Sequence, residues 1–191
     1  ADVMTGMYAS TAILAALRHR DATGEGQHID TCLLDTQVSW LINEGTNYLV
    51  SGKVPIKLGN EHPNIVPYKV FATSNGHVIL AVGNDRQWQR MVSLMNQPQL
   101  AQDERFRTNA LRVQHRDELL SLLAKEFTTQ PASHWLTLLG GSKGIPVGPI
   151  NSIPTVMTDP QVLARDMIQE IEHPTVGKLK LVGPAVKYSS T

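Results

Sequence analysis

The chain has 191 residues, of which 41% are hydrophobic and 18% are charged, a composition typical of a folded globular protein. Seventeen basic residues balance seventeen acidic ones, which argues against nucleic acid or an anionic membrane surface as a partner. Cys32 is the only cysteine, so the chain has no internal disulfide and no cysteine-based metal site. No apolar run reaches the roughly 20 residues of a membrane helix, and the seven histidines lack ligand spacing, so neither a membrane span nor a metal is predicted.

The first fifty residues predict a helix, a strand and a second helix. Residues 3–20 are rich in Ala, Leu and Met and predict a helix, with Asp2 directly before it. Residues 27–33 alternate partly around Ile29 and predict a short strand, and residues 34–50 predict another helix. This is half of a parallel α/β unit without a strand to pair with, so we expect the chain to be an N-terminally truncated part of a longer protein.

The density of Gly and Pro then rises over residues 51–67, which predicts a linker and a loop. Residues 68–73 and 77–82 flank Asn75-Gly76, a strong signal for a β-hairpin. Helices are predicted over residues 84–95, 116–127 and 131–140, an edge strand over residues 145–150, and a short helix over residues 160–165. Residues 167–172 and 178–182 alternate and predict a second β-pair.

The opening sequence Asp2-Val3-Met4-Thr5-Gly6-Met7 is followed, after an Ala-rich stretch, by Gly24-Glu25-Gly26-Gln27. Together with residues 59–68, 82–85, 148–151, 159–162, 172–177 and 183–184, these segments resemble the family III CoA-transferases (CaiB/BaiF type), in collinear order over essentially the whole chain. The resemblance implies a mixed α+β or α/β fold, in which a small α/β domain is joined to a remnant of a Rossmann-like large domain. We expect residues 1–50 to be that remnant, 51–67 the linker and active-site loop, 68–150 the small domain and 151–191 a return segment toward the large domain.

The resemblance assigns the catalytic role to Asp2. In the family, the aspartate before a Thr-Gly-Met-type sequence attacks an acyl-CoA thioester, and an aspartyl-CoA thioester forms during the exchange. From spacing alone, an ordinary helix cap is the more common role of an aspartate at this place. The family match favours the nucleophile.

The resemblance also nominates binding residues. Residues 59–68 align with the loop that covers the covalent intermediate, and within them Gly59, Asn60, His62 and Asn64 are candidates to approach the acyl group or the acceptor. A linker built of turn-forming residues explains the same composition equally well. Leu33 matches a position that lines the CoA pocket, although a core leucine is as good an explanation.

One arginine-rich stretch invites a nucleotide-binding interpretation: Arg105, Arg107, Arg112 and Arg116 follow one another closely. The intervening Glu104, Asp117 and Glu118 favour a solvated, ion-paired face instead.

Taken with the resemblance, the sequence predicts part of an enzyme that transfers CoA between small carboxylic acids, with a lean toward dicarboxylates. CoA thioester is expected as a substrate and not as a tightly bound cofactor, the partner as a second copy in a homodimer, and the compartment as the cytoplasm, or the mitochondrial matrix in a eukaryote. We expect the chain to be inactive alone, because most groups that hold CoA lie in the half preceding the nucleophile. An α-methylacyl-CoA racemase-like fragment and a non-catalytic dimerising module are the alternatives.

Overall fold

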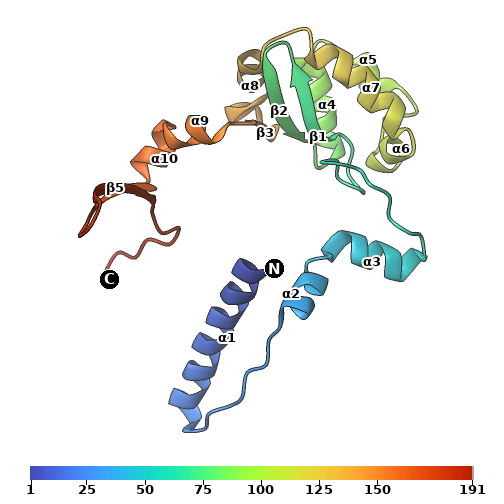
Figure 1. The fold of residues 1–191 in the computed structure, drawn as a ribbon. Helices are drawn as coiled ribbons and strands as arrows, with labels where there is room; N and C mark the ends of the chain where they lie inside the picture. Colours follow the sequence, from blue (N-terminus) through green and yellow to red (C-terminus); the bar gives the residue numbers. More distant parts are fainter. Residues whose placement is uncertain (191) are drawn as a thin grey trace. The chain divides into compact units, whose positions relative to one another are not determined.

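The computed structural model describes residues 1–190, which form two compact units (Figure 1). The first unit covers Ala1–Pro63 and the second begins at Asn64. Helices and short antiparallel sheets are both present, which confirms the mixed fold class. Within residues 1–190, no helix combines the length and apolar character that crossing a bilayer requires.

The first unit contains three helices, α1 (Asp2–Thr23), α2 (Leu33–Ser39) and α3 (Ile42–Ser51). Helix α1 ends at Gly24, whose φ of 79° is left-handed and whose N–H bonds the carbonyl of Arg20. The predicted strand over residues 27–33 was wrong. This segment is extended, but no strand of the described residues pairs with it, and a strand exists only through such pairing. The predicted helix over residues 34–50 is two helices, broken at Trp40 and Leu41.

The first unit has almost no interior of its own. Thr36 is its one buried residue among those described, and the hydrophobic side chains of all three helices are largely exposed. Val3, Leu14, Leu34, Ile42, Leu49 and Val50 each expose more than 65% of their surface. The first unit therefore has no hydrophobic core of its own among the described residues.

The second unit is organised around a three-stranded antiparallel sheet of order β1–β2–β3. Strands β1 (Tyr68–Thr73) and β2 (Gly76–Ala81) form the predicted hairpin, and β3 (Val147–Pro149) lies at the edge, as the prolines around it require. The hairpin register pairs Thr73 with Gly76. The two-residue turn is therefore Ser74-Asn75, one residue earlier than the Asn75-Gly76 signal predicted.

The helices of the second unit provide most of its core. In chain order they are α4 (Asp85–Leu94), α5 (Gln99–Gln102), α6 (Asn109–Gln114), α7 (Arg116–Phe127), α8 (Ala132–Leu139) and the 3-10 turn η1 (Gly141–Lys143). Helices α7 and α8 pack on the sheet, and the buried hydrophobic residues run from Val66 to Ile145. At the centre, the ring of Phe127 stacks on Phe71 of β1 at 4.6 Å and lies 4.7 Å from Trp135 of α8.

Asn75 joins the hairpin turn to the start of helix α8. Its side-chain Oδ1 accepts a hydrogen bond of 2.9 Å from the backbone N–H of Ala132, the first residue of that helix. Pro131 occupies the capping position but makes no side-chain cap bond. Asn75, from the hairpin turn, instead provides the hydrogen-bond acceptor for a backbone N–H in the first turn of helix α8.

We expect Asn75→Ala to lower the stability of the second unit by about 1 kcal/mol, the usual effect of losing a helix cap. Thermal unfolding compared with Ser74→Ala provides the check. Ser74 bonds Gln130 through its backbone N–H, which alanine keeps. Equal melting temperatures for the two variants would contradict this role.

The chain continues through α9 (Ile153–Met157) and α10 (Pro160–Ala164) into a second antiparallel pair, β4 (Ile168–His173) and β5 (Gly177–Val182). Helix α10 begins with Pro160, and the Asp159 carboxylate accepts the N–H groups of Gln161 and Val162. The predicted helix near residue 160 and the predicted β-pair are both confirmed.

Candidate active site

Asp2 lies at the N-terminal end of helix α1. It is the first residue of the helix, and Ala1 occupies the capping position. The carbonyl of Ala1 accepts the N–H of Thr5 at 2.9 Å and its hydroxyl at 3.0 Å. Asp2 is therefore not the helix cap that its spacing suggested. Its carboxylate is exposed in the first turn, where the positive end of the helix dipole favours a negative charge.

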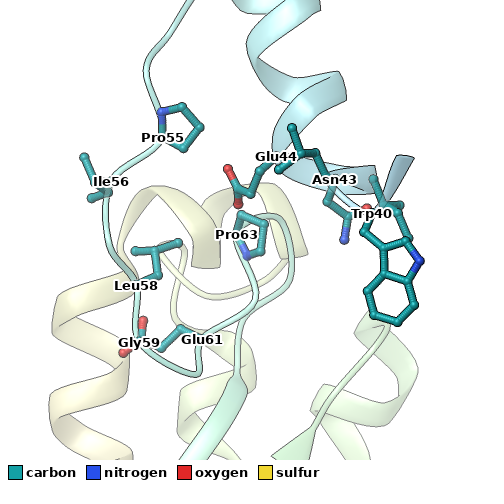
Figure 2. Close-up of a pocket in the computed structure, with 11 residues that line it drawn as sticks. Trp40, Asn43, Glu44, Pro55, Ile56, Leu58, Gly59, Glu61 and Pro63 are labelled. Carbon is teal, nitrogen blue, oxygen red and sulfur yellow. The ribbon is translucent and has the colours of Figure 1, made fainter. Parts of the chain in front are cut away.

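A cavity of about 460 Å³ lies within the first unit, between the start of helix α3 and the chain that follows that helix (Figure 2). One side is formed by residues 40–44 and the other by residues 55–63. Its lining residues are Trp40, Leu41, Ile42, Asn43, Glu44, Pro55, Ile56, Leu58, Gly59, Glu61 and Pro63.

The 59–68 loop enters this cavity through a tight turn. The N–H of Glu61 bonds the carbonyl of Leu58 at 3.1 Å, which places Gly59 and Asn60 at the centre of the turn. Gly59 has φ of 64°, a conformation that side chains with a Cβ adopt at a cost. A glycine is required here by the turn, independently of any role toward a substrate.

His62 connects the loop to helix α3. The Asn43 side-chain amide Nδ2 lies 3.4 Å from Nε2 of His62, and an amide N–H can only donate. The ring nitrogen Nε2 is therefore the acceptor of this contact, which connects the loop to the first turn of helix α3.

The lining of the cavity carries the carboxyl groups of Glu44 and Glu61 and the side-chain amide of Asn43, and it includes neither lysine nor arginine. The polar side chains that the cavity offers are therefore carboxyl acceptors and one amide donor.

The structure brings only some of the predicted site residues together. Of Asp2, Leu33, Gly59, Asn60, His62 and Asn64, only Gly59 lines the cavity. Leu33 is the first residue of helix α2 and is 51% exposed, so it is not a core leucine of the described chain. The backbone carbonyl of Asn64 accepts a 2.8 Å hydrogen bond from the side chain of Asn109. No three His, Cys, Asp or Glu side chains of residues 1–190 gather as a metal site would require.

The arginine-rich stretch divides into exposed and buried members. Arg105 is exposed and pairs with Asp103 and Glu118, and its hydrogen bond lowers the pKa of Asp103 to about 2. Arg107 is exposed and pairs with Glu104. These two fit the solvated face that the charge pattern predicted.

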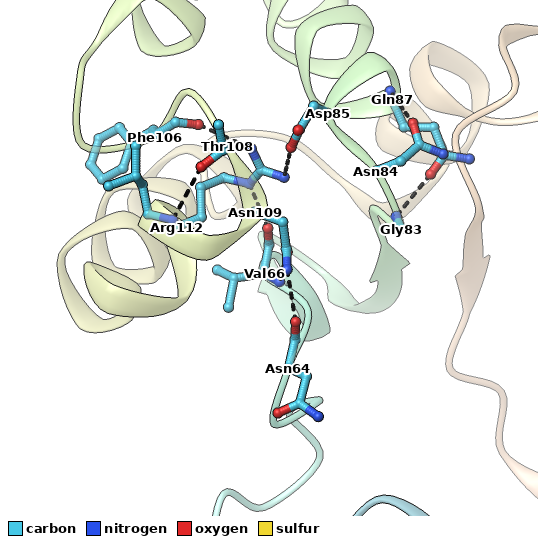
Figure 3. Close-up of polar contacts among 11 residues, drawn as sticks. Asn64, Val66, Gly83, Asn84, Asp85, Gln87, Phe106, Thr108, Asn109 and Arg112 are labelled. Atoms are coloured by element: carbon cyan, nitrogen blue, oxygen red, sulfur yellow. Dashed lines mark hydrogen bonds and ion pairs between the residues drawn. The ribbon is translucent and has the colours of Figure 1, made fainter.

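Arg112 does not belong to that solvated face, because its side chain is completely buried (Figure 3). Its guanidinium donates to the carbonyl of Val66 at 2.7 Å, to the carbonyl of Phe106 at 3.0 Å and to the carboxylate of Asp85 at 2.9 Å. It also lies over the ring of Trp88, 5.2 Å from the centroid. Burial lowers the pKa of Arg112, and the Asp85 ion pair opposes that shift.

Comparison with known proteins identifies the family of this chain. The model of CoA-transferase family III matches residues 1–191, and the chain therefore belongs to that family. It is 43% identical over 188 residues to a mouse protein named succinyl-CoA:glutarate CoA-transferase, with 98% of this chain and 43% of the relative aligned. It is 46% identical over 172 residues to an Agrobacterium fabrum protein named succinate–glutarate CoA-transferase, with 90% and 43% aligned.

Solved structures are also similar to this chain. A CaiB/BaiF family protein of Brucella suis is 40% identical, with a TM-score of 0.69 over 98% of this chain and 48% of the other. The Mycobacterium tuberculosis protein Rv3272, at 22% identity, shares the fold with a TM-score of 0.81 over 98% and 49%. The chain spans less than half the length of these relatives.

Proposed function

We propose that this chain is part of an enzyme that transfers CoA between small dicarboxylic acids, with succinyl-CoA and glutarate as the first pair to test. The observation that carries the proposal is the identity of 43% and 46% to relatives named for that exchange, over 90% or more of the chain. The family membership supports a CoA thioester as substrate. In this proposal CoA is bound and released in each cycle.

Asp2 is the proposed nucleophile. Its carboxylate attacks the thioester carbonyl of the donor, which forms a mixed anhydride and expels CoA thiolate. The thiolate then attacks the aspartyl carbonyl, forms an aspartyl-CoA thioester and releases the donor acid as its carboxylate. The same two steps, run backward with the acceptor acid, give the new acyl-CoA and regenerate Asp2. The exposed position of Asp2 in the first turn of α1 supports this role, because the helix end stabilises its ionised form and the oxyanions that form there.

The 59–68 loop is proposed to cover the acylated aspartate. Gly59 and Asn60 form a turn whose backbone can approach a ligand closely, and His62 and Asn64 follow it. We assign contact with the acceptor carboxylate to backbone N–H and side-chain donors of this loop. Leu33, exposed at the start of α2, is proposed to contact bound CoA.

The exposed apolar side chains of the first unit support a larger assembly. We propose that residues 1–50 belong to a larger CoA-binding domain, that 68–150 form the small domain, and that 151–191 return toward the large one. In this proposal the active enzyme is a homodimer, and the 191 residues alone have no CoA-transferase activity. The reaction is placed in the cytoplasm, or the mitochondrial matrix in a eukaryote.

The test is to purify the full gene product that contains these residues and mix it with succinyl-CoA and glutarate. The expected result is the appearance of glutaryl-CoA and free succinate, followed by chromatography, from a protein that light scattering shows to be dimeric. Epimerisation of a 2-methylacyl-CoA without any transfer would favour the racemase alternative instead. If the protein reacted with none of the acyl-CoA substrates tested, the non-catalytic dimerising module would be the remaining alternative.

A further inference from the structure

The buried charge of Arg112 belongs to a wider set of contacts that ends at the 59–68 loop (Figure 3). Asn109 lies one helical turn before Arg112 on α6. Its Oδ1 accepts the backbone N–H of Val66 at 3.1 Å, and its Nδ2 donates to the backbone carbonyl of Asn64 at 2.8 Å. Arg112, which lies on α6 as Asn109 does, donates to the backbone carbonyl of Val66. Two side chains of α6 thus hold three backbone groups of the loop.

The helix that carries these side chains is anchored through Arg112, which donates to the carbonyl of Phe106 immediately before the helix at 3.0 Å. Thr108 is the capping residue, but its hydroxyl oxygen accepts the N–H of Leu111 only through a long hydrogen bond of 3.4 Å. On the other side, the guanidinium is paired with Asp85, the first residue of helix α4.

The start of helix α4 is held by a reciprocal pair of side-chain bonds. Asn84 is the capping residue and accepts the N–H of Gln87, while the Gln87 side chain accepts the N–H of Gly83. The Val82–Asp85 segment, which takes part in the family resemblance, therefore positions the carboxylate that pairs with Arg112.

We infer that Asn109 and Arg112 are positioning residues for the 59–68 loop, and that they set how well the loop excludes water from the covalent intermediate. The inference rests on the proposed function. Its basis is that the backbone of residues 64–66 cannot shift without breaking three hydrogen bonds, one of them to a buried guanidinium. Breaking such bonds leaves buried polar groups unsatisfied, so the downstream end of the loop stays in one place.

A fixed loop end has a chemical consequence. Water can attack either acyl carbon of the mixed anhydride, or the aspartyl carbonyl of the thioester. Each attack adds one water oxygen, breaks the C–O or C–S bond and ends as free acid, free CoA thiol and regenerated Asp2. A loop that is ordered in advance closes over the intermediate at little entropic cost and keeps this water out. A loop with a loose end permits hydrolysis to compete with transfer.

The experiment compares three variants of the full gene product. Asn109→Ala removes both contacts to the loop, and Asn109→Asp keeps an acceptor for the Val66 N–H but loses the donor to Asn64. Thr108→Ala is the matched control, because it weakens the cap of the same helix and leaves the Asn109 side chain in place. Thermal unfolding measures the general loss of stability in each.

Two readouts separate positioning from stability. Hydrogen exchange of the Val66 amide, which needs no substrate, is expected to become about tenfold faster in Asn109→Ala, as the loss of one hydrogen bond implies, and much less so in Asn109→Asp and Thr108→Ala. The ratio of succinyl-CoA hydrolysis to CoA transfer is expected to rise about tenfold in Asn109→Ala and to stay at the wild-type value in Thr108→Ala.

Unchanged exchange at Val66 in Asn109→Ala would overturn the inference whatever the activity. Faster exchange with an unchanged hydrolysis-to-transfer ratio, in a wild-type protein that does transfer CoA, would overturn it while leaving the proposed function intact. A wild-type protein that transfers no CoA would overturn the proposed function and, with it, the role of these residues in that reaction.

Discussion

Asp2→Asn in the full gene product is expected to lower kcat/KM for CoA transfer from succinyl-CoA to glutarate by about 10,000-fold or more, the size of effect seen when a covalent nucleophile is removed. An asparagine side chain is nearly the same size and stays polar, but its amide cannot attack the thioester carbonyl. Folding should be preserved, because Asp2 is exposed and is not the cap of helix α1.

Asp21→Asn is the matched control for this variant. Asp21 is an exposed acid on the same helix and pairs only with the neighbouring Arg20 at the surface, as far as the described contacts show. Its replacement is expected to leave the rate within twofold of wild type, since surface pairs contribute little. If Asp2→Asn and Asp21→Asn had the same rate, the assignment of the nucleophile would be wrong.

Phe127→Ala is expected to destabilise the second unit by about 3–5 kcal/mol, the usual range for truncating a buried phenylalanine. The Phe127 ring is fully buried between Phe71 and Trp135, and its carbonyl accepts the indole N–H of Trp135 at 2.9 Å. Removing the ring leaves a cavity where the sheet, α7 and α8 meet.

The free energy of opening, measured by hydrogen exchange of the β1 and α7 amides, reports this loss without assuming that the whole protein unfolds in two states. Leu122→Ala on the same helix is the control, because Leu122 is 41% exposed and its truncation is expected to cost less than about 1 kcal/mol. Similar protection in both variants would show that the aromatic cluster is not the centre of the fold.

Local patterns predicted most elements of the second unit. The 68–73 strand, the 116–127 helix and the closing β-pair are where apolar periodicity and turn residues placed them. The 68–73 strand and the 116–127 helix bury one face against the core, so their periodicity is a direct consequence of the contacts they make, whereas the two strands of the closing pair contact each other and stay largely exposed. The hairpin turn lies one residue earlier than predicted, at Ser74-Asn75, and the side chain of Asn75 bonds the start of helix α8 from there.

The first unit was less predictable for the opposite reason. Alternation over residues 27–33 indicated a strand, but strands are defined by partners, and the described chain offers none to this segment. The break between helices α2 and α3 falls at Trp40 and Leu41, where the sequence has no Gly or Pro to indicate the end of a helix.

Local sequence patterns could not predict the contacts by which Asn109 and Arg112 hold residues 64–66. Arg112 lies among acids at a spacing typical of a solvated face, and its burial depends on Val66, 46 residues earlier in the chain. No pattern within a helical turn or two encodes such a distant contact. The cavity was missed similarly, because its lining residues Glu44 and Glu61 lie on two separate segments that meet only through the fold.

The central claim is that Asp2 becomes acylated during turnover, and hydroxylamine trapping tests it most directly. The full gene product is incubated with succinyl-CoA, quenched with hydroxylamine and digested for mass spectrometry. The account predicts an aspartyl hydroxamate at Asp2 that requires succinyl-CoA and disappears in Asp2→Asn. A hydroxamate at another carboxylate, or none in a protein that transfers CoA, would contradict it.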